Sequence, residues 1–114
     1  MNPAMSPQQI MQLYESIARL MQEMARAAGN QDWERLRELE GQCRPITHTL
    51  MALEPGTDLP DDLKRAKFML LRDILEYDAT IRTFTESWMT ELQGLIGNTS
   101  TRRKLVRAYG SGLH

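Results

Sequence analysis

The feature that most constrains this chain is a long stretch, from Asp61 to about Gly97, in which apolar residues recur at gaps of three and four. These gaps place the apolar side chains on one face of an α-helix, and neither glycine nor proline interrupts the stretch as far as Gln93. At 1.5 Å per residue, roughly 35 residues make a rod of about 50 Å. Because charged residues line its other face, this helix needs other helices against its apolar face. The apolar positions are Leu63, Ala66, Leu70, Ile74, Tyr77, Ile81, Phe84, Trp88, Leu92 and Leu95.

An earlier helix is predicted from about Pro7 to Ala28. Ser6 is a typical N-cap, proline fits the first turn, and the Gly29-Asn30 pair ends the helix. The segment from Met1 to Met5 is expected to be disordered. The apolar residues of this helix form two adjacent stripes, Ile10, Leu13, Ile17, Leu20 and Met24 beside Met11, Tyr14, Ala18, Met21 and Ala25.

A second helix is predicted to follow at once, with Asn30 as its cap, and to end at the loop from Glu54 to Pro60. Pro45 lies within its apolar stripe, where a proline removes one hydrogen bond and clashes with the carbonyl four residues back. That residue is Gly41, which has no Cβ and eases a bend. We therefore expect a kinked helix rather than a break. The stripe consists of Leu36, Leu39, Cys43, Ile46, Leu50 and Leu53.

The predicted fold class is all-α, an antiparallel helical bundle of three long helices plus a short C-terminal fourth helix. Short loops between the long helices favour antiparallel neighbours in an up-down-up order. The linker from Gly97 to Thr101 leads to a fourth helix of about 8–10 residues, which is stable only if it packs on the body. We expect one domain over residues 1–114, with a body at about 7–97 and a regulatory tail at 98–114.

Composition is that of an ordinary soluble globular protein, with 41% hydrophobic and 25% charged residues. No apolar run approaches the ~20 residues of a membrane span, and the N-terminus lacks the pattern of a secretory signal. A single cysteine fits a cytoplasmic setting. Charge is uneven, because residues 1–97 carry 10 basic and 15 acidic side chains, whereas residues 98–114 carry four basic and none acidic. A cationic tail can dock on an acidic body or on a partner.

Catalysis, metals and cofactors find little support in the sequence, so we expect no enzyme. His48 and His114 are far apart, and Cys43 lies about 140° around a helix from His48, so these two do not share a ligand-forming face. Cys43 is expected in the core and His48 near the surface. The basic residues of the tail, Arg102, Arg103, Lys104 and Arg107, lack the aromatic platform of a nucleic-acid site, and holding the tail to the body is the stronger interpretation.

Apolar residues exceed what one face per helix requires. A second stripe on the long helix consists of Phe68, Leu71, Leu75, Met89 and Ile96. Two interpretations stay open: these residues widen the core, or they line a groove that receives another helix. In the second interpretation the partner-binding residues are Phe68, Leu71, Leu75, Trp33, Met89, Leu92 and Ile96. The tail residues Leu105, Val106 and Tyr109 are then expected to cover part of that surface.

Three segments together resemble the FliT family of flagellar export chaperones. The first is Gly29–Leu36, the second covers Ile74–Arg82 and Glu91–Gly97, and the third is Arg103–Gly110. The resemblance extends from the first helix to about Gly110. The chain departs from the family pattern at Pro45 and in its short tail.

The resemblance implies a small cytoplasmic, all-helical chaperone of the flagellar type III export system. Its partner would be the C-terminal helical region of the filament-cap protein FliD, which it would keep unassembled and deliver to the export apparatus. Further partners in the family are the export ATPase complex and, in some members, the transcription factor FlhDC. The family's C-terminal helix regulates access to the binding surface, and Leu105, Val106 and Tyr109 match that helix. The alternatives are a structural bundle that self-assembles, a homodimer included, or a regulator that sequesters FlhDC.

Overall fold

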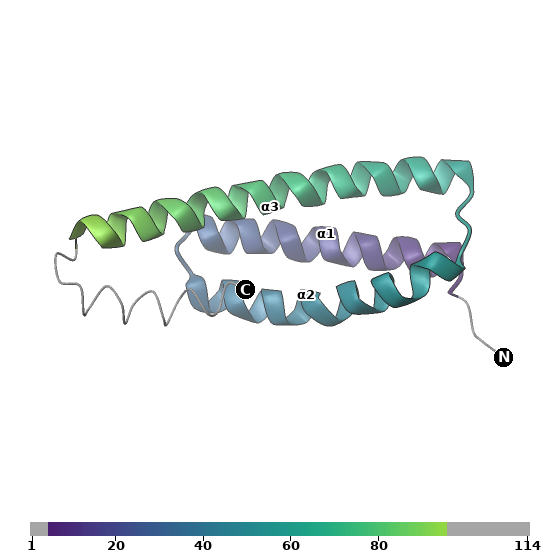
Figure 1. Cartoon of the computed structure of the whole chain (residues 1–114), viewed down its shortest axis with the longest axis horizontal. Helices are drawn as coiled ribbons and strands as arrows, with labels where there is room; N and C mark the ends of the chain where they lie inside the picture. Colours follow the sequence, from purple (N-terminus) through teal and green to yellow (C-terminus); the bar gives the residue numbers. More distant parts are fainter. Residues whose placement is uncertain (1–4, 96–114) are drawn as a thin grey trace.

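The chain folds into three long helices joined by short connections (Figure 1). The structure is a computed structural model, and it describes residues 5–95. Helix α1 covers Pro7–Gly29, α2 covers Trp33–Leu53, a 3₁₀ turn covers Glu54–Gly56, and α3 covers Asp61–Leu95. No strand occurs among residues 5–95, which confirms the all-α class. The expected fourth helix lies outside the described residues.

Helix α1 begins at the predicted cap. The backbone N–H of Gln9 donates to Oγ of Ser6 at 3.1 Å, and the backbone N–H of Ser6 donates to Oε1 of Gln9 at 2.9 Å. This reciprocal pair satisfies two backbone groups that a helix start otherwise leaves without partners. Met5, just ahead, packs against the core, and its carbonyl accepts a 3.0 Å hydrogen bond from the hydroxyl of Thr57. The expectation that Met5 is disordered is therefore wrong.

The cap of α2 differs from the prediction. Oδ1 of Asp32 accepts a hydrogen bond from the backbone N–H of Arg35 at 3.1 Å, so Asp32 and not Asn30 caps α2. Asn30 instead closes α1, because its backbone N–H donates to the carbonyl of Arg26 at 3.1 Å. Between them Gln31 adopts a left-handed backbone with φ of 59°, which reverses the chain before α2 starts.

Helix α1 lies between α2 and α3 and packs against both, whereas α2 and α3 approach each other at few points (Figure 1). The three helices are antiparallel in sequence order, as predicted. Because α1 has a neighbour on two sides, residues of both its stripes are buried, Met11 and Tyr14 included. Helix α3 lies on the outside, and among its described residues Ile81 alone is buried. One side of α3 is therefore left without a helix against it.

The core consists of two apolar clusters along α1. The buried residues of the first are Ile10, Tyr14, Ile17, Cys43, Leu50 and Leu59, and those of the second are Met24, Ala27, Ala28, Leu36, Leu39 and Ile81. Each cluster joins α1 to residues of α2, and the first also reaches the loop before α3. Burial of these side chains supplies the main favourable term in folding.

Helix α2 runs through Pro45 without a break, as predicted, and its ribbon is bowed in Figure 1. Proline cannot donate the hydrogen bond that would reach the carbonyl of Gly41. A Cβ added at Gly41 would meet no atom within 4 Å apart from its chain neighbours and the backbone of its own helical turns, so this position has room for a side chain. The helix therefore accommodates the proline by curving rather than by ending.

Candidate partner-binding surface

The surface of α3 that faces the end of α2 carries an open groove of about 550 Å³. The Phe68 side chain, with 67% of its surface exposed, forms its apolar wall together with Leu71. The opposite wall comes from the loop that connects α2 to α3. The lining residues are Glu54, Pro55, Thr57, Asp58, Leu59, Lys64, Lys67, Phe68 and Leu71.

The three residues predicted for this surface differ in burial. Phe68 and Leu75 are exposed, with 67% and 65% of their surfaces accessible, whereas Leu71 is half-buried and packs against the first core cluster. Leu71 therefore serves the core and the groove wall together. Leu71 therefore fits the interpretation that the stripe widens the core, whereas for the exposed Phe68 and Leu75 the partner-binding interpretation stays a prediction.

A second groove, of about 440 Å³, lies farther along between α2 and α3, with α1 as its floor. Its apolar lining comes from all three helices and its rim is charged; the lining residues are Met21, Met24, Leu36, Glu40, Asp78, Ile81, Arg82, Thr85 and Glu86. The α3 residues of both grooves recur at helical gaps of three and four, so both grooves lie on the same side of α3. From Phe68 to Glu86 this side extends about 27 Å.

The far end of the same side is closed by two tryptophans. Trp33 of α2 stacks on Trp88 of α3, with ring centroids 5.9 Å apart and planes inclined by 29°. Both indole N–H groups are buried, and neither has a hydrogen-bond acceptor among residues 5–95. Met89, which follows Trp88 directly, and Leu92, about one turn farther along α3, are half-buried.

The predicted partner-binding residues therefore fall into two groups. Phe68, Leu71 and Leu75 lie in the first half of α3, and Trp88 lies about 20–30 Å away from them along the helix. Ile96 and the tail residues Leu105, Val106 and Tyr109 lie outside the described residues. The structure brings together Trp33 and Trp88, but it does not bring the two groups into one patch.

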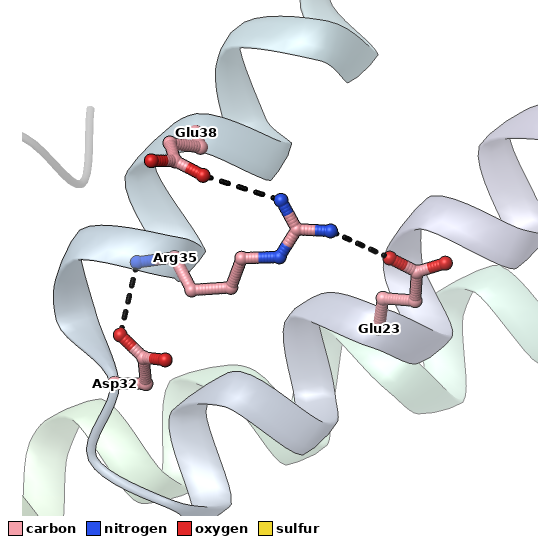
Figure 2. Close-up of polar contacts among 4 residues, drawn as sticks. All are labelled: Glu23, Asp32, Arg35 and Glu38. Carbon is pink, nitrogen blue, oxygen red and sulfur yellow. Dashed lines mark hydrogen bonds and ion pairs between the residues drawn. The ribbon is translucent and has the colours of Figure 1, made fainter.

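Arg35 connects the start of α2, where Trp33 lies, to α1 (Figure 2). Its guanidinium donates to Glu23 of α1 at 3.3 Å and to Glu38 of α2 at 3.2 Å, while its backbone N–H donates to Asp32. All three side chains of the ion pairs are about half exposed, so each pair contributes little to stability. The Glu23 contact joins the start of α2, which carries Trp33, to α1.

A polar contact that sequence reasoning missed closes the other end of the bundle. The hydroxyl of Tyr14 donates a 2.6 Å hydrogen bond to Glu54, and the other carboxylate oxygen of Glu54 forms an ion pair with Lys67. The ammonium of Lys67 also lies over the Tyr14 ring, 5.4 Å from its centroid. Burial, followed by the hydrogen bond to Glu54 and its charge, raises the pKa of Tyr14 far above its usual value. No periodic pattern in the sequence marks these three residues as neighbours.

Cys43 and His48, the residues considered for catalysis or metal binding, lie at positions typical of structural residues. Cys43 is buried, and burial raises the pKa of its thiol, whereas His48 is exposed. No group of three or more His, Cys, Asp or Glu side chains within residues 5–95 is arranged to hold a metal ion. None of the helices between residues 5 and 95 is both long and apolar enough to cross a membrane.

This fold and these grooves define an all-α bundle protein with a candidate docking surface between its second and third helices. A family model described as "Flagellar protein FliT" matches residues 11–111. Proteins named "Flagellar protein FliT" from Escherichia coli K12, O157:H7 and O139:H28 are each 25% identical to the chain over 101 residues, covering 85% of this chain and 80% of the relative. Comparison with solved structures found no match. The chain belongs to the FliT family of flagellar chaperones, as its resemblance indicated.

Proposed function

We propose that this protein is a cytoplasmic flagellar export chaperone that binds the C-terminal helical region of the filament-cap protein FliD. The observation that carries the proposal is the pair of large apolar side chains, Phe68 and Leu75, that α3 exposes beside the two grooves. Family membership supports a flagellar chaperone, and the grooves supply a surface on which such a chaperone could hold a helix.

The side of α3 that faces α2 has the dimensions of a helix-binding surface. Its span of about 27 Å equals the length of a helix of about 18 residues. A partner helix laid there would cover Phe68 and Leu75, which have no covering neighbour among residues 5–95. Methionines in the floor, Met21 and Met24, are adaptable in shape and tolerate partners that differ in detail. While the partner helix is bound to this surface, its own apolar face would be unavailable for assembly.

We further propose that the tail, residues 98–114, regulates access at the tryptophan end. Leu105, Val106 and Tyr109 would cover Trp33 and its neighbours on α3. The two buried indole N–H groups support the idea, because unpaired buried donors are rare and their acceptors do not lie among residues 5–95. A covered surface lowers the fraction of binding-competent molecules and with it the apparent affinity. Delivery of the partner to the export apparatus stays a prediction from the resemblance. Binding to the export ATPase complex and binding to FlhDC stay predictions in the same way.

Co-purification with the filament-cap protein tests the proposal. The full chain should retain FliD and lose it when FliD lacks its C-terminal helical region. A Leu75→Ala variant should retain less. Glu76→Ala changes an exposed position of α3 that lies about 100° around the helix from Leu75 and outside both grooves, so it should retain as much as the unmodified chain. Retention that does not depend on the C-terminal helical region of FliD would contradict the proposal.

A second candidate function, self-assembly through the same surface, is favoured by the same exposed Phe68 and Leu75. Size-exclusion chromatography with light scattering separates the two. A large oligomer whose size does not change with concentration would support the structural bundle, and a small species that gains mass on adding FliD would support the chaperone.

A further inference from the structure

The two grooves on the α2-facing side of α3 differ in charge. The loop-end groove is balanced, because its lining holds two cations, Lys64 and Lys67, and two anions, Glu54 and Asp58. Lys67 is already paired with Glu54. A partner that binds at this end meets mainly apolar surface, that of Phe68 and Leu71, with no net charge to match.

The groove nearer the tryptophans is acidic. Its lining holds three carboxylates and one guanidinium: Glu40, Asp78, Glu86 and Arg82. Asp78 pairs with Arg82 at 2.8 Å, and Glu40 pairs with Arg44 of its own helix at 2.7 Å. Glu86 forms no ion pair with any residue between 5 and 95. A cation on the partner is the complement that this carboxylate lacks.

We infer that the groove binds an amphipathic helix in one direction, with the basic end of that helix at Glu86 and its uncharged apolar end against Phe68 and Leu71. The inference deepens the proposed function, on which it rests, by specifying the chemistry of the partner helix and its orientation. Apolar contact supplies the affinity along the whole groove. The charge difference between the two ends supplies the direction, because the opposite orientation places cations over a balanced, apolar surface and leaves Glu86 unmatched.

The chain carries its own reporter of this orientation. It has two tryptophans, Trp33 and Trp88, and they stack on each other at the acidic end. Trp88 follows Thr85, a lining residue of this groove, by three residues and so shares its face of α3, whereas Phe68 lies about 30 Å away along the helix. A short-range quencher on the bound peptide therefore lowers the tryptophan fluorescence strongly if it is attached to the end of the peptide near the tryptophans. It lowers the fluorescence weakly if it is attached to the other end.

The test uses the full chain and a designed peptide probe rather than FliD. The peptide is an amphipathic helix of about 18 residues, without tryptophan, with a leucine stripe, lysines confined to one end, and serine and glutamine elsewhere. Two versions carry a nitroxide at the basic end or at the uncharged end. We expect saturable quenching from the basic-end label and little from the other. Equal quenching from both, stronger quenching from the uncharged end, or no saturable binding would overturn the inference.

A matched pair of variants tests the role of Glu86. Glu86→Lys should weaken peptide binding about three- to tenfold, the range expected for losing an exposed ion pair and gaining a repulsion. Glu76→Lys makes the same change in net charge at an exposed position of α3 outside both grooves, and it should leave binding unchanged. Equal effects of the two variants would reduce the role of Glu86 to net charge and overturn the inference. The peptide experiments contain no FliD, so they fail or succeed independently of FliD retention. Peptide binding in the expected direction without retention of FliD would refute only the proposed function. Retention of FliD without peptide binding in the expected direction would refute only the inference.

Discussion

Trp33 at the first turn of α2 stacks on Trp88 in the last third of α3, with 5.9 Å between ring centroids. This contact is one of the few that join α2 directly to α3, which otherwise pack on α1. At the opposite end the Glu54–Lys67 ion pair makes a second connection between the end of α2 and α3. The second groove lies in the interval between these two contacts, whereas the first groove lies at the Glu54–Lys67 pair, which belongs to its lining.

Replacing Trp33 by alanine should lower the free energy of unfolding by about 2–3 kcal/mol. The loss is below the range for a fully buried tryptophan because Trp33 is half-buried. Trp33→Phe keeps an aromatic ring and removes an indole N–H that has no acceptor within residues 5–95, so it should change stability by less than about 1 kcal/mol. Urea denaturation followed by circular dichroism measures both. Equal losses for the two variants would contradict the expectation that an aromatic ring at position 33 preserves the contact with Trp88.

The hydrogen bond between Tyr14 and Glu54 should make stability depend on alkaline pH. The pKa of Tyr14 is raised in the folded chain, so the unfolded chain releases this proton first as pH rises past about 10. Stability from this group is complete below pH 10 and falls above it. Tyr14→Phe should remove that fall and, by deleting a hydrogen bond to a charged group, cost about 1.5–3 kcal/mol at neutral pH. Denaturation at several pH values between neutral and alkaline tests both effects.

Glu54→Gln provides the control for that experiment. The amide oxygen of glutamine still accepts the Tyr14 hydrogen bond, but the substitution removes the negative charge. The pKa of Tyr14 should therefore fall toward its usual value, and it should remain above that value because Tyr14 is buried. Tyrosinate absorbance, measured as the difference between each chain and its Tyr14→Phe counterpart, follows this single group. An unchanged titration in the Glu54→Gln variant would mean that the charge of Glu54 does not contribute to the raised pKa of Tyr14.

Helix positions and most of the core follow from spacing in the sequence, as Leu36, Leu39, Cys43 and Leu50 illustrate, since all four are buried as predicted. Spacing does not reveal how many neighbours a helix has. Met11 and Phe68 both lie on second stripes, yet Met11 is buried because α1 is central, and Phe68 is exposed because α3 is peripheral.

The polar contacts at the ends of the bundle were not predictable for a related reason. Tyr14, Glu54 and Lys67 come from three different elements, and their meeting depends on how the helices are offset along their axes. Short loops fix that helices are antiparallel, but they do not fix this offset. The choice of Asp32 over Asn30 as the α2 cap depended on the left-handed turn at Gln31, which neither glycine nor another strong signal marks.

Shortening the chain to end at Gly97 should increase its affinity for FliD. If the tail covers the tryptophan end, each ~1.4 kcal/mol that holds it closed weakens apparent binding about tenfold. We expect a gain of about three- to thirtyfold, equivalent to about 0.6–2 kcal/mol. Tyr109→Ala in the full chain should give a smaller gain of the same sign. Weaker binding by the shortened chain would make the tail part of the binding site.

The central claim, that the side of α3 facing α2 binds the filament-cap protein, is tested most directly by titration calorimetry with the C-terminal helical region of FliD. Phe68→Ala and Leu75→Ala should each reduce affinity about thirtyfold, the effect of losing an interface anchor of about 2 kcal/mol. Both side chains are about two-thirds exposed, so the unfolding free energy should change by no more than about 0.5 kcal/mol. Leu50→Ala, at a core position, should instead destabilise the fold by about 2–5 kcal/mol. Unchanged affinity in the folded Phe68→Ala and Leu75→Ala variants would contradict the account.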